Sequence, residues 1–310
     1  MAIYHLRVKF VQRSAGRSAV AAAAYRSGSK LEDEHRGTTE DYTRKRDVEH
    51  SEIILPDHMP VSLNERGVLW NAIETGIKHP RGQPAFEVEV ALPRELSKAQ
   101  CVELVREFSR DHFVNEGLPV DINIHRTKAS DGGEHPHAHI LISTRRFHAD
   151  GSLDKAARDL QDNPKLVAKV YALEEEGKLD EALLLQKDLH LGKWRKAWGD
   201  YSNRFLEKAD SESRIDHRTL AAQEIDREPT PNVGIGFYGH LRAFQGHMAE
   251  RIDHWKEIGF RNSMREQMDR IKEKRPDLNA EFIAHAREYA QNLFPELKGQ
   301  EPDRGLEHEH

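Results

Sequence analysis

Three histidines form the most informative pattern in this sequence of 310 residues. His137 and His139 are separated by one residue, so both side chains point to the same side of a β-strand. His125 lies on the preceding expected strand, and the Asp-Gly-Gly at 131–133 is typical of the turn between the two. In an even register His125 lies opposite one of the other two, and three imidazoles converge above the sheet. Imidazole binds transition and borderline divalent metals, and three protein ligands leave coordination positions for a substrate.

The alternation along these strands favours the even register. An odd register would turn His125 toward the apolar side, where a histidine is costly. A pair of surface histidines is the simpler explanation of an isolated His-x-His. The third histidine, with matching parity, makes the metal site the favoured interpretation. His135, just before Pro136, is expected in solvent.

Two carboxylates and one tyrosine could complete the chemistry. Glu87 and Glu89 share one face of an expected strand, where a carboxylate can orient a ligand imidazole or accept a proton. Two solvated glutamates are the equally weighted alternative. Tyr25 follows four alanines on an expected helix. A phenol titrates near about pH 10, yet it can attack a metal-polarised phosphate. A helix tyrosine taken alone is more often a packing residue.

Short strands and helices alternate in the first half of the chain and would position these groups. The patterns predict strands at 3–10, 52–55, 85–92, 120–127 and 136–143, and helices at 18–26, 62–78 and 97–113. The strands have one apolar face and one face with ionisable groups. This predicts an α+β fold in which helices pack mainly on one face of an antiparallel sheet and the other face is open for chemistry.

The strand pattern ends near residue 150. Residues 165–190 are expected to be helical with a break at Gly177, and 229–239 form a linker rich in Pro and Gly. We therefore expect a first domain at 1–228 with a helical insertion at about 155–191, then a helical region at 240–304 with helices at 241–258 and 280–293. Residues 305–310 resemble a cloning scar with part of an affinity tag. A helix packed on the sheet domain is predicted from the spacing of Trp194, Trp198, Tyr201, Phe205 and Leu206.

Composition narrows the class of protein. The formal net charge of −6 argues against a generic nucleic-acid coat, and no apolar run is long enough for a membrane span. A single cysteine, Cys101, excludes a disulfide scaffold, and the expected location is a reducing cytoplasm. The first 50 residues carry ten Lys and Arg against seven Asp and Glu, including Arg44-Lys45-Arg46. Any contact with nucleic acid is expected at such a local patch, where Tyr42 could stack on a base.

Several segments, in this order, resemble the MobA/MobL mobilization relaxases, whose relaxase domain is of the HUH endonuclease class. The resemblance covers roughly residues 1–227. The segments are Met1-Ala2-Ile3-Tyr4-His5-Leu6, Ala23-Ala24-Tyr25-Arg26-Ser27, Phe86-Glu87-Val88-Glu89-Val90-Ala91-Leu92-Pro93, Glu134-His135-Pro136-His137-Ala138-His139-Ile140 and Arg214-Ile215-Asp216-His217-Arg218-Thr219-Leu220.

The resemblance implies a five-stranded antiparallel sheet and a DNA-nicking activity at a plasmid transfer origin. Tyr25 would attack one phosphodiester, leaving a 5′-phosphotyrosyl strand and a free 3′-hydroxyl, and the reverse reaction would rejoin the strand. A divalent metal, Mg²⁺ or Mn²⁺, would be held by His125, His137 and His139. Either Glu87 or Glu89 would support this chemistry, and the sequence does not separate the two.

The resemblance also implies partners. These are the single-stranded origin DNA, accessory relaxosome proteins and a type IV secretion coupling protein, with delivery from the donor cytoplasm into the recipient. We expect the DNA contacts to be made by Arg7, Lys9, Arg26, Tyr42, Arg44, Lys45 and Arg46.

Three alternatives remain open at this point. A rolling-circle replication initiator would use the same sheet and similar histidines. A metal-dependent hydrolase would keep Tyr25 only as a core residue. A DNA-binding module would have no catalytic activity.

Overall fold

A computed structural model describes residues 4–129, 132–176, 178–220, 223, 225–228 and 247–274. The chain divides into two compact units, 1–218 and 219–310. The first unit contains the sheet and all the predicted site residues.

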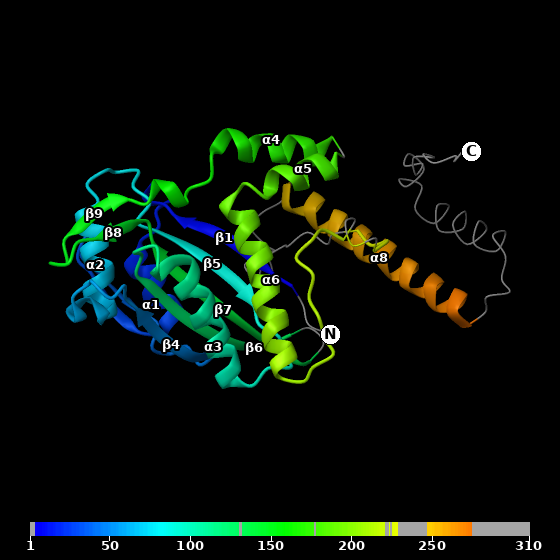
Figure 1. Ribbon diagram of the computed structural model, residues 1–310, viewed down its shortest axis with the longest axis horizontal. Helices are drawn as coiled ribbons and strands as arrows, with labels where there is room; N and C mark the ends of the chain where they lie inside the picture. The colour runs from blue at the N-terminus through cyan, green and yellow to red at the C-terminus, as the bar shows by residue number, and fades with distance from the viewer. Residues whose placement is uncertain are drawn as a thin grey trace. The chain divides into compact units, whose positions relative to one another are not determined.

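The first unit is built on the expected five-stranded antiparallel sheet (Figure 1). The two strands that carry the histidines, β6 and β7, lie next to each other inside the sheet, where both edges of each strand are paired. The fourth strand in chain order begins earlier than the alternation predicted, at Val48 rather than at residue 52. In spatial order the strands are β1 (Leu6–Val11), β5 (Ala85–Ala91), β7 (Glu134–Ser143), β6 (Val120–Lys128) and β4 (Val48–Ile54).

Two helices cover the apolar face of the sheet, as Figure 1 shows. Helix α3 (Lys98–Ser109) begins with a capping box, in which Ser97 and Gln100 satisfy each other's backbone N–H groups. It continues into a π-helical turn, Arg110–Val114. Helix α6 (His190–Lys208) supplies the predicted aromatic stripe, and its Trp198 is fully buried against Phe108. Their shared core explains why these two helices remain on this face.

Two further helices cover part of the opposite face. Helices α1 (Ala19–Ser27) and α2 (Arg66–Gly76) pack over Val11, Ala85 and Leu141, which occupy polar-face positions at one end of the sheet. The face expected to be open is therefore open only in part. The reason is that its residues change from ionisable to apolar toward that end, and apolar strand positions need a cover.

Smaller elements complete the first unit. Two hairpins that the sequence patterns did not predict are β2 (Lys30–Asp33) with β3 (Thr38–Asp41), and β8 (Arg145–Phe147) with β9 (Leu153–Ala156). The predicted helical segment with a break near residue 177 is confirmed as α4 (Pro164–Glu175) and α5 (Leu179–Gln186). Short helical turns lie at Arg13–Ala15, Val61–Asn64 and Arg158–Leu160.

The second unit contains one described helix, α8 (His247–Lys274). Arg261 and Arg265 of this helix donate to the Glu228 carboxylate, and Asn262 accepts from the Glu228 backbone N–H at 2.9 Å. The predicted linker at 229–239 and the predicted helix at 280–293 lie outside the described residues. No helix in the described ranges is long and apolar enough to cross a membrane.

Candidate active site

The three predicted histidines meet on the uncovered part of the polar face. The register pairs His125 of β6 directly with His137 of β7, and His139 follows on the same side two residues later. Their ring centroids are 5.4 Å (His125–His137), 4.7 Å (His125–His139) and 5.1 Å (His137–His139) apart. One nitrogen from each ring lies within 4.8 Å of the others. The expected convergence of three imidazoles is therefore present.

Each ring uses one nitrogen to hydrogen-bond a fixed oxygen. The other nitrogen is the one that a metal would bind, and in His125 this nitrogen, Nδ1, lies 3.2 Å from the Lys45 ammonium, which a bound metal would displace. The Nε2 of His125 donates to the Arg26 backbone carbonyl at 2.6 Å, and the Nδ1 of His137 donates to the His135 carbonyl at 3.0 Å. The Nδ1 of His139 lies 2.6 Å from Oε1 of Glu87. Metal-binding histidines are typically oriented in this way by oxygens behind them. The residues present therefore fit a divalent metal.

Burial keeps His125 and His137 uncharged in the absence of a cation. Burial and, to a smaller extent, the neighbouring imidazoles lower the pKa of His125 and of His137 to about 4. Hydrogen bonds to backbone carbonyls act in the opposite direction but do not overcome the burial. Near neutral pH these rings present lone pairs rather than protons, as a metal ligand must.

Glu87 connects the histidines to the helix that carries Tyr25. Its carboxylate accepts from Arg26 Nε at 2.7 Å and from Arg26 Nη2 at 2.6 Å, in addition to His139. Burial alone would raise the pKa of Glu87, but the hydrogen bonds from His139 and Arg26 hold it well below its usual value. The Glu87 side chain is therefore a buried, ionised carboxylate.

Glu89 has a different environment on the same strand. It pairs with Lys9 on the neighbouring edge strand and is more exposed than Glu87. Glu87, Glu89 and His139 also form a group that could bind a cation. Both carboxylates of that group already have a cationic partner, so the three-histidine group is the better metal site.

Tyr25 lies near the end of α1 and is 49% exposed. Its ring makes an edge-on contact with Tyr42 at 5.2 Å between centroids, and the Lys45 ammonium lies 4.3 Å from its centroid. Helix α1 ends at Gly28, whose φ of 63° suits glycine. A core role for the Tyr25 ring is excluded by this exposure.

Lys45 lies between the tyrosine and the histidines. Its Nζ is 3.2 Å from Nδ1 of His125 and 3.6 Å from a carboxylate oxygen of Asp47. Burial lowers the pKa of Lys45, although Asp47 opposes the shift. Lys45 and Asp47 thus extend the site, and Asp47 was not singled out by the sequence analysis because it lies in an irregular segment between β3 and β4.

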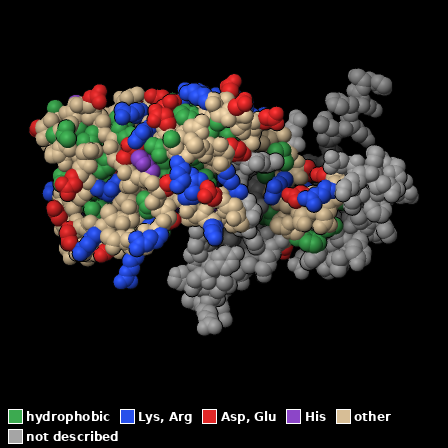
Figure 2. All heavy atoms as spheres, turned by 90° about the horizontal axis from the view of Figure 1, so that it is seen from below, with side chains coloured by type: hydrophobic (Ala, Val, Ile, Leu, Met, Phe, Trp, Pro, Cys, Tyr) green, Lys and Arg blue, Asp and Glu red, His purple; other side chains and the backbone are tan. Residues whose placement is uncertain are grey.

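The other predicted basic residues have varied surroundings. Arg7, Arg44 and Arg46 are exposed, whereas Arg26 is committed to Glu87. In Figure 2 positive and negative side chains are interspersed over the described part of the visible face. Positive charge on the described part of this face is therefore confined to small local groups of Lys and Arg.

A groove of about 310 Å³ runs between β1 and α1 and reaches Tyr25. Lys9, Arg17, Arg26 and Arg36 line it, against one acidic residue, Glu87. Among the described residues no carboxylate lies within ion-pair distance of Arg17. Sequence reasoning missed Arg17 and Arg36 because they lie in the connection before α1 and in the turn between β2 and β3, where no periodic pattern indicates the direction of a side chain.

Comparison with known proteins identifies the family. Residues 17–239 match the model of the MobA/MobL family. Over 257 residues the chain is 35% identical to "Mobilization protein MobL" of Acidithiobacillus ferridurans, covering 76% of this chain and 62% of that protein. Over 238 residues it is 37% identical to "Mobilization protein A" of Escherichia coli, covering 76% of this chain and 30% of that protein.

A solved structure supports the same conclusion. The chain aligns with a protein from a structure titled "Molecular Basis of Vancomycin Resistance Transfer in Staphylococcus aureus", with a TM-score of 0.57 and 27% sequence identity. The alignment covers 70% of this chain and 100% of that one. This chain belongs to the MobA/MobL family. It spans less than two thirds of the length of the two curated relatives named above.

Proposed function

We propose that this protein is a mobilization relaxase, which nicks one strand of DNA at a plasmid transfer origin by transesterification and later rejoins it. The observation that carries the proposal is the juxtaposition of an exposed tyrosine with three converging imidazoles, joined through Glu87. Family membership supports the same assignment.

The reaction exchanges one phosphodiester bond for another. The Tyr25 oxygen forms a bond to phosphorus while the bond from phosphorus to the 3′-oxygen of the neighbouring nucleotide breaks. The phenol loses one proton and the departing 3′-oxygen gains one, so the balance needs no water and no cofactor redox step. Energy is retained in the phosphotyrosine, and attack by a 3′-hydroxyl reverses the step.

The chain's own groups prepare this reaction. Lys45 places a positive charge beside the phenol, which favours the ionised oxygen as it forms. Glu87 fixes the His139 ring and Arg26 together. His125, His137 and His139 would hold a divalent metal, with Mg²⁺ or Mn²⁺ as the proposed ions. Such a metal, when bound, would polarise the phosphate and offset the charge that develops on it.

The groove between β1 and α1 supports a path for the single-stranded DNA. Its arginines can neutralise phosphates next to the one attacked, and Arg7, Arg44 and Arg46 can extend that contact. Tyr42 is half-exposed beside Tyr25 and can stack on a base. Lys9 and Arg26 line the same groove, but Glu89 and Glu87 already balance their charges, so we expect these two cations to contribute less to phosphate binding than Arg17 does.

The proposal includes partners and a location. We expect accessory relaxosome proteins at the origin and a type IV secretion coupling protein that accepts the protein joined to its strand. Nicking would take place in the donor cytoplasm, and delivery would follow into the recipient.

The alternatives make different products. A metal-dependent hydrolase would cut the DNA without joining it to Tyr25. In such an enzyme Tyr25 would have a purely structural role, and the exposure of its ring argues against that role. A binding module would neither cut nor join. A rolling-circle initiator would form the same kind of adduct, but the MobA/MobL family match favours mobilization.

A denaturing gel tests the proposal. The purified chain is incubated with Mn²⁺ or Mg²⁺ and a randomised pool of single-stranded oligonucleotides labelled at the 3′ end, and protein that carries label after denaturation is recovered. We expect an adduct that a peptidase digest places at Tyr25, and sequencing of the joined DNA then identifies the preferred site. Cleavage without an adduct would support the hydrolase, and absence of both would contradict the proposal.

A further inference from the structure

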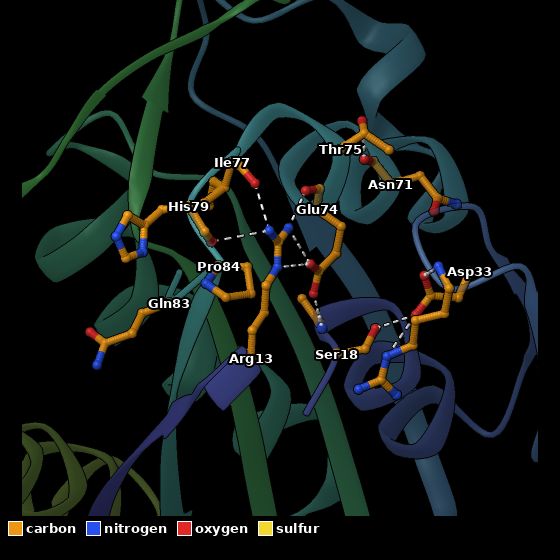
Figure 3. Close-up of polar contacts among 12 residues, drawn as sticks. Arg13, Ser18, Asp33, Asn71, Glu74, Thr75, Ile77, His79, Gln83 and Pro84 are labelled. Carbon is orange, nitrogen blue, oxygen red and sulfur yellow. Dashed lines mark hydrogen bonds and ion pairs between the residues drawn. The ribbon is translucent and has the colours of Figure 1, made fainter. Parts of the chain in front are cut away.

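The first turn of α1, at the end opposite Tyr25, is held by buried polar groups from other segments (Figure 3). The Ser18 hydroxyl accepts from the Ala21 backbone N–H at 3.2 Å and hydrogen-bonds the Asp33 carboxylate of β2. Glu74 of α2 accepts from the Ala19 backbone N–H at 2.5 Å. Ser18, Asp33 and Glu74 are all buried, so water does not substitute for these contacts.

Positive groups compensate the two buried carboxylates. Arg13 donates to Glu74 Oε2 from Nε at 2.9 Å and from Nη2 at 2.7 Å, and its Nη1 donates to the Ile77 carbonyl at 2.6 Å. Figure 3 shows Arg13 reaching Glu74, Ile77 and His79 at once. Asp33 accepts from the Arg36 backbone N–H at 3.0 Å, and the Arg36 Nε lies 3.9 Å from Asp33 Oδ2. The positive end of the helix dipole also faces these carboxylates. We name Arg13, Ser18, Asp33 and Glu74 the α1 clamp.

Helix α1 has few other means of fixing its position along its axis. Its buried side chains are Ala19, Val20, Ala23 and Ala24, and methyl groups interlock only weakly with a neighbouring surface. The helix has nine residues, so its first turn lies within two turns of Tyr25. The exposed Tyr25 ring packs on Tyr42 and Lys45 alone among the described aromatic and cationic groups. The helix backbone therefore determines where the phenol oxygen lies.

We infer that Ser18 and Glu74 are positioning residues for Tyr25: through the α1 clamp they hold the nucleophile's helix in register with the histidine cluster. This inference rests on the proposed function. The pair of Glu87 and Arg26 holds the C-terminal end of α1, and the α1 clamp holds its N-terminal end. Together these two sets of contacts define the position of the helix. Misplacement of a reacting group by about 1 Å can cost up to roughly a hundredfold in rate.

Two N-cap variants form a matched pair that separates positioning from stability. Ser18→Ala removes the cap of α1, and Ser97→Ala removes the cap of α3, which carries no predicted site residue. Both should lower the urea midpoint of unfolding, Ser18→Ala by more because the buried Asp33 carboxylate loses a donor, so the rates are compared where both variants are fully folded. With the oligonucleotide selected from the pool, only Ser18→Ala should slow single-turnover adduct formation, by roughly tenfold, with DNA affinity unchanged. Ser18→Thr, which keeps the hydroxyl, should retain most of the rate.

A second variant probes the clamp from α2. Glu74→Gln keeps an oxygen for the Ala19 N–H but removes the charge that pairs with Arg13, so it should also slow adduct formation. If Glu74→Gln does not fold, the comparison of adduct rates between Ser18→Ala and Ser97→Ala tests the inference by itself. Equal adduct rates for Ser18→Ala and Ser97→Ala would overturn the inference.

A readout that is independent of activity distinguishes this inference from the proposed function. The NMR signal of the Tyr25 ring, assigned with Tyr25→Phe in tyrosine-labelled protein, should shift or broaden in Ser18→Ala and stay in place in Ser97→Ala. If the wild-type chain forms no adduct, the proposed function fails while this signal still decides whether the clamp positions Tyr25. An unchanged signal in Ser18→Ala would overturn the clamp whatever the activity.

Discussion

Glu87 joins Arg26 and His139 through a single carboxylate oxygen: Oε1 lies 2.7 Å from Arg26 Nε and 2.6 Å from His139 Nδ1. Arg26 is the residue next to the proposed nucleophile, and His139 is a proposed metal ligand. The two halves of the chemistry, on α1 and on β7, are thus held together by one buried side chain of β5.

This relationship predicts which of the two carboxylates matters more. Glu87→Gln should weaken Mn²⁺ binding by roughly 10- to 100-fold, because the ring behind the metal loses its orienting anion. Glu89→Gln removes the pair with Lys9, but the Glu89 carboxylate makes no described hydrogen bond to the three histidines, so this change should weaken binding much less. Isothermal titration with Mn²⁺ measures both, and equal losses in the two variants would refute the assignment to Glu87.

Tyr25→Phe should abolish the covalent adduct, because the phenylalanine ring keeps its packing but has no oxygen to attack phosphorus. Affinity for single-stranded DNA should be retained. Tyr42→Phe is the matched control, since Tyr42 contacts Tyr25 on its ring edge and the change keeps the ring. An adduct in Tyr25→Phe on the denaturing gel would show that the nucleophile is another residue.

Removal of one imidazole should distinguish ligands from neighbours. His137→Ala should abolish measurable Mn²⁺ binding and adduct formation, because two imidazoles remain where three are needed. His135→Ala should bind Mn²⁺ normally, because His135 stacks on His137 but interacts with it through a backbone carbonyl that the change retains. A chelator should have the effect of His137→Ala on the wild-type chain. Metal binding that survives His137→Ala would exclude the three-histidine site.

The neighbouring basic residues 44 and 45 should behave differently. Arg44→Ala, which changes an exposed side chain, should weaken DNA binding. It should also reduce the slope of log affinity against log salt by about 0.7 for each phosphate that the protein no longer neutralises. An unchanged slope, measured by fluorescence anisotropy across a salt series, would remove Arg44 from the DNA-binding surface.

Lys45→Ala should instead act mainly on the reaction. Its ammonium contacts the Tyr25 ring and the His125 ring, so its loss should slow adduct formation by roughly tenfold. DNA affinity should change less than in Arg44→Ala. A normal rate in single-turnover assays would show that Lys45 does not assist the phenol.

The sheet and the histidine cluster could be predicted from the sequence because both depend on a period of two. Alternation placed His125, His137 and His139 on one face, and the same alternation placed Val120, Ile122 and Ile124 on the other. A strand pattern is local, so it can be recognised without knowledge of the rest of the fold. The register that pairs His125 with His137 is confirmed for the same reason.

The features of the fold and of the site that the sequence did not predict depend on contacts between distant segments. The β2–β3 hairpin carries mostly polar residues and has no apolar face to indicate a strand. The pairing of Glu87 with Arg26 joins residues 61 positions apart, and no spacing rule connects them. The cover that α1 and α2 provide over part of the polar face also follows only from tertiary packing, as does the difference between Glu87 and Glu89.

The parity of β6 and β7 sets a limit on how the family could tolerate insertions. One extra residue within 120–125 or 137–142 would exchange the two faces of that strand after the insertion. Imidazoles would then point into the apolar core and isoleucines toward the solvent. Additional residues in the connection between 129 and 133 would leave both faces as they are. Relatives should therefore differ in the length of this connection while the spacing within each strand stays constant, and grafted sequences are best inserted there.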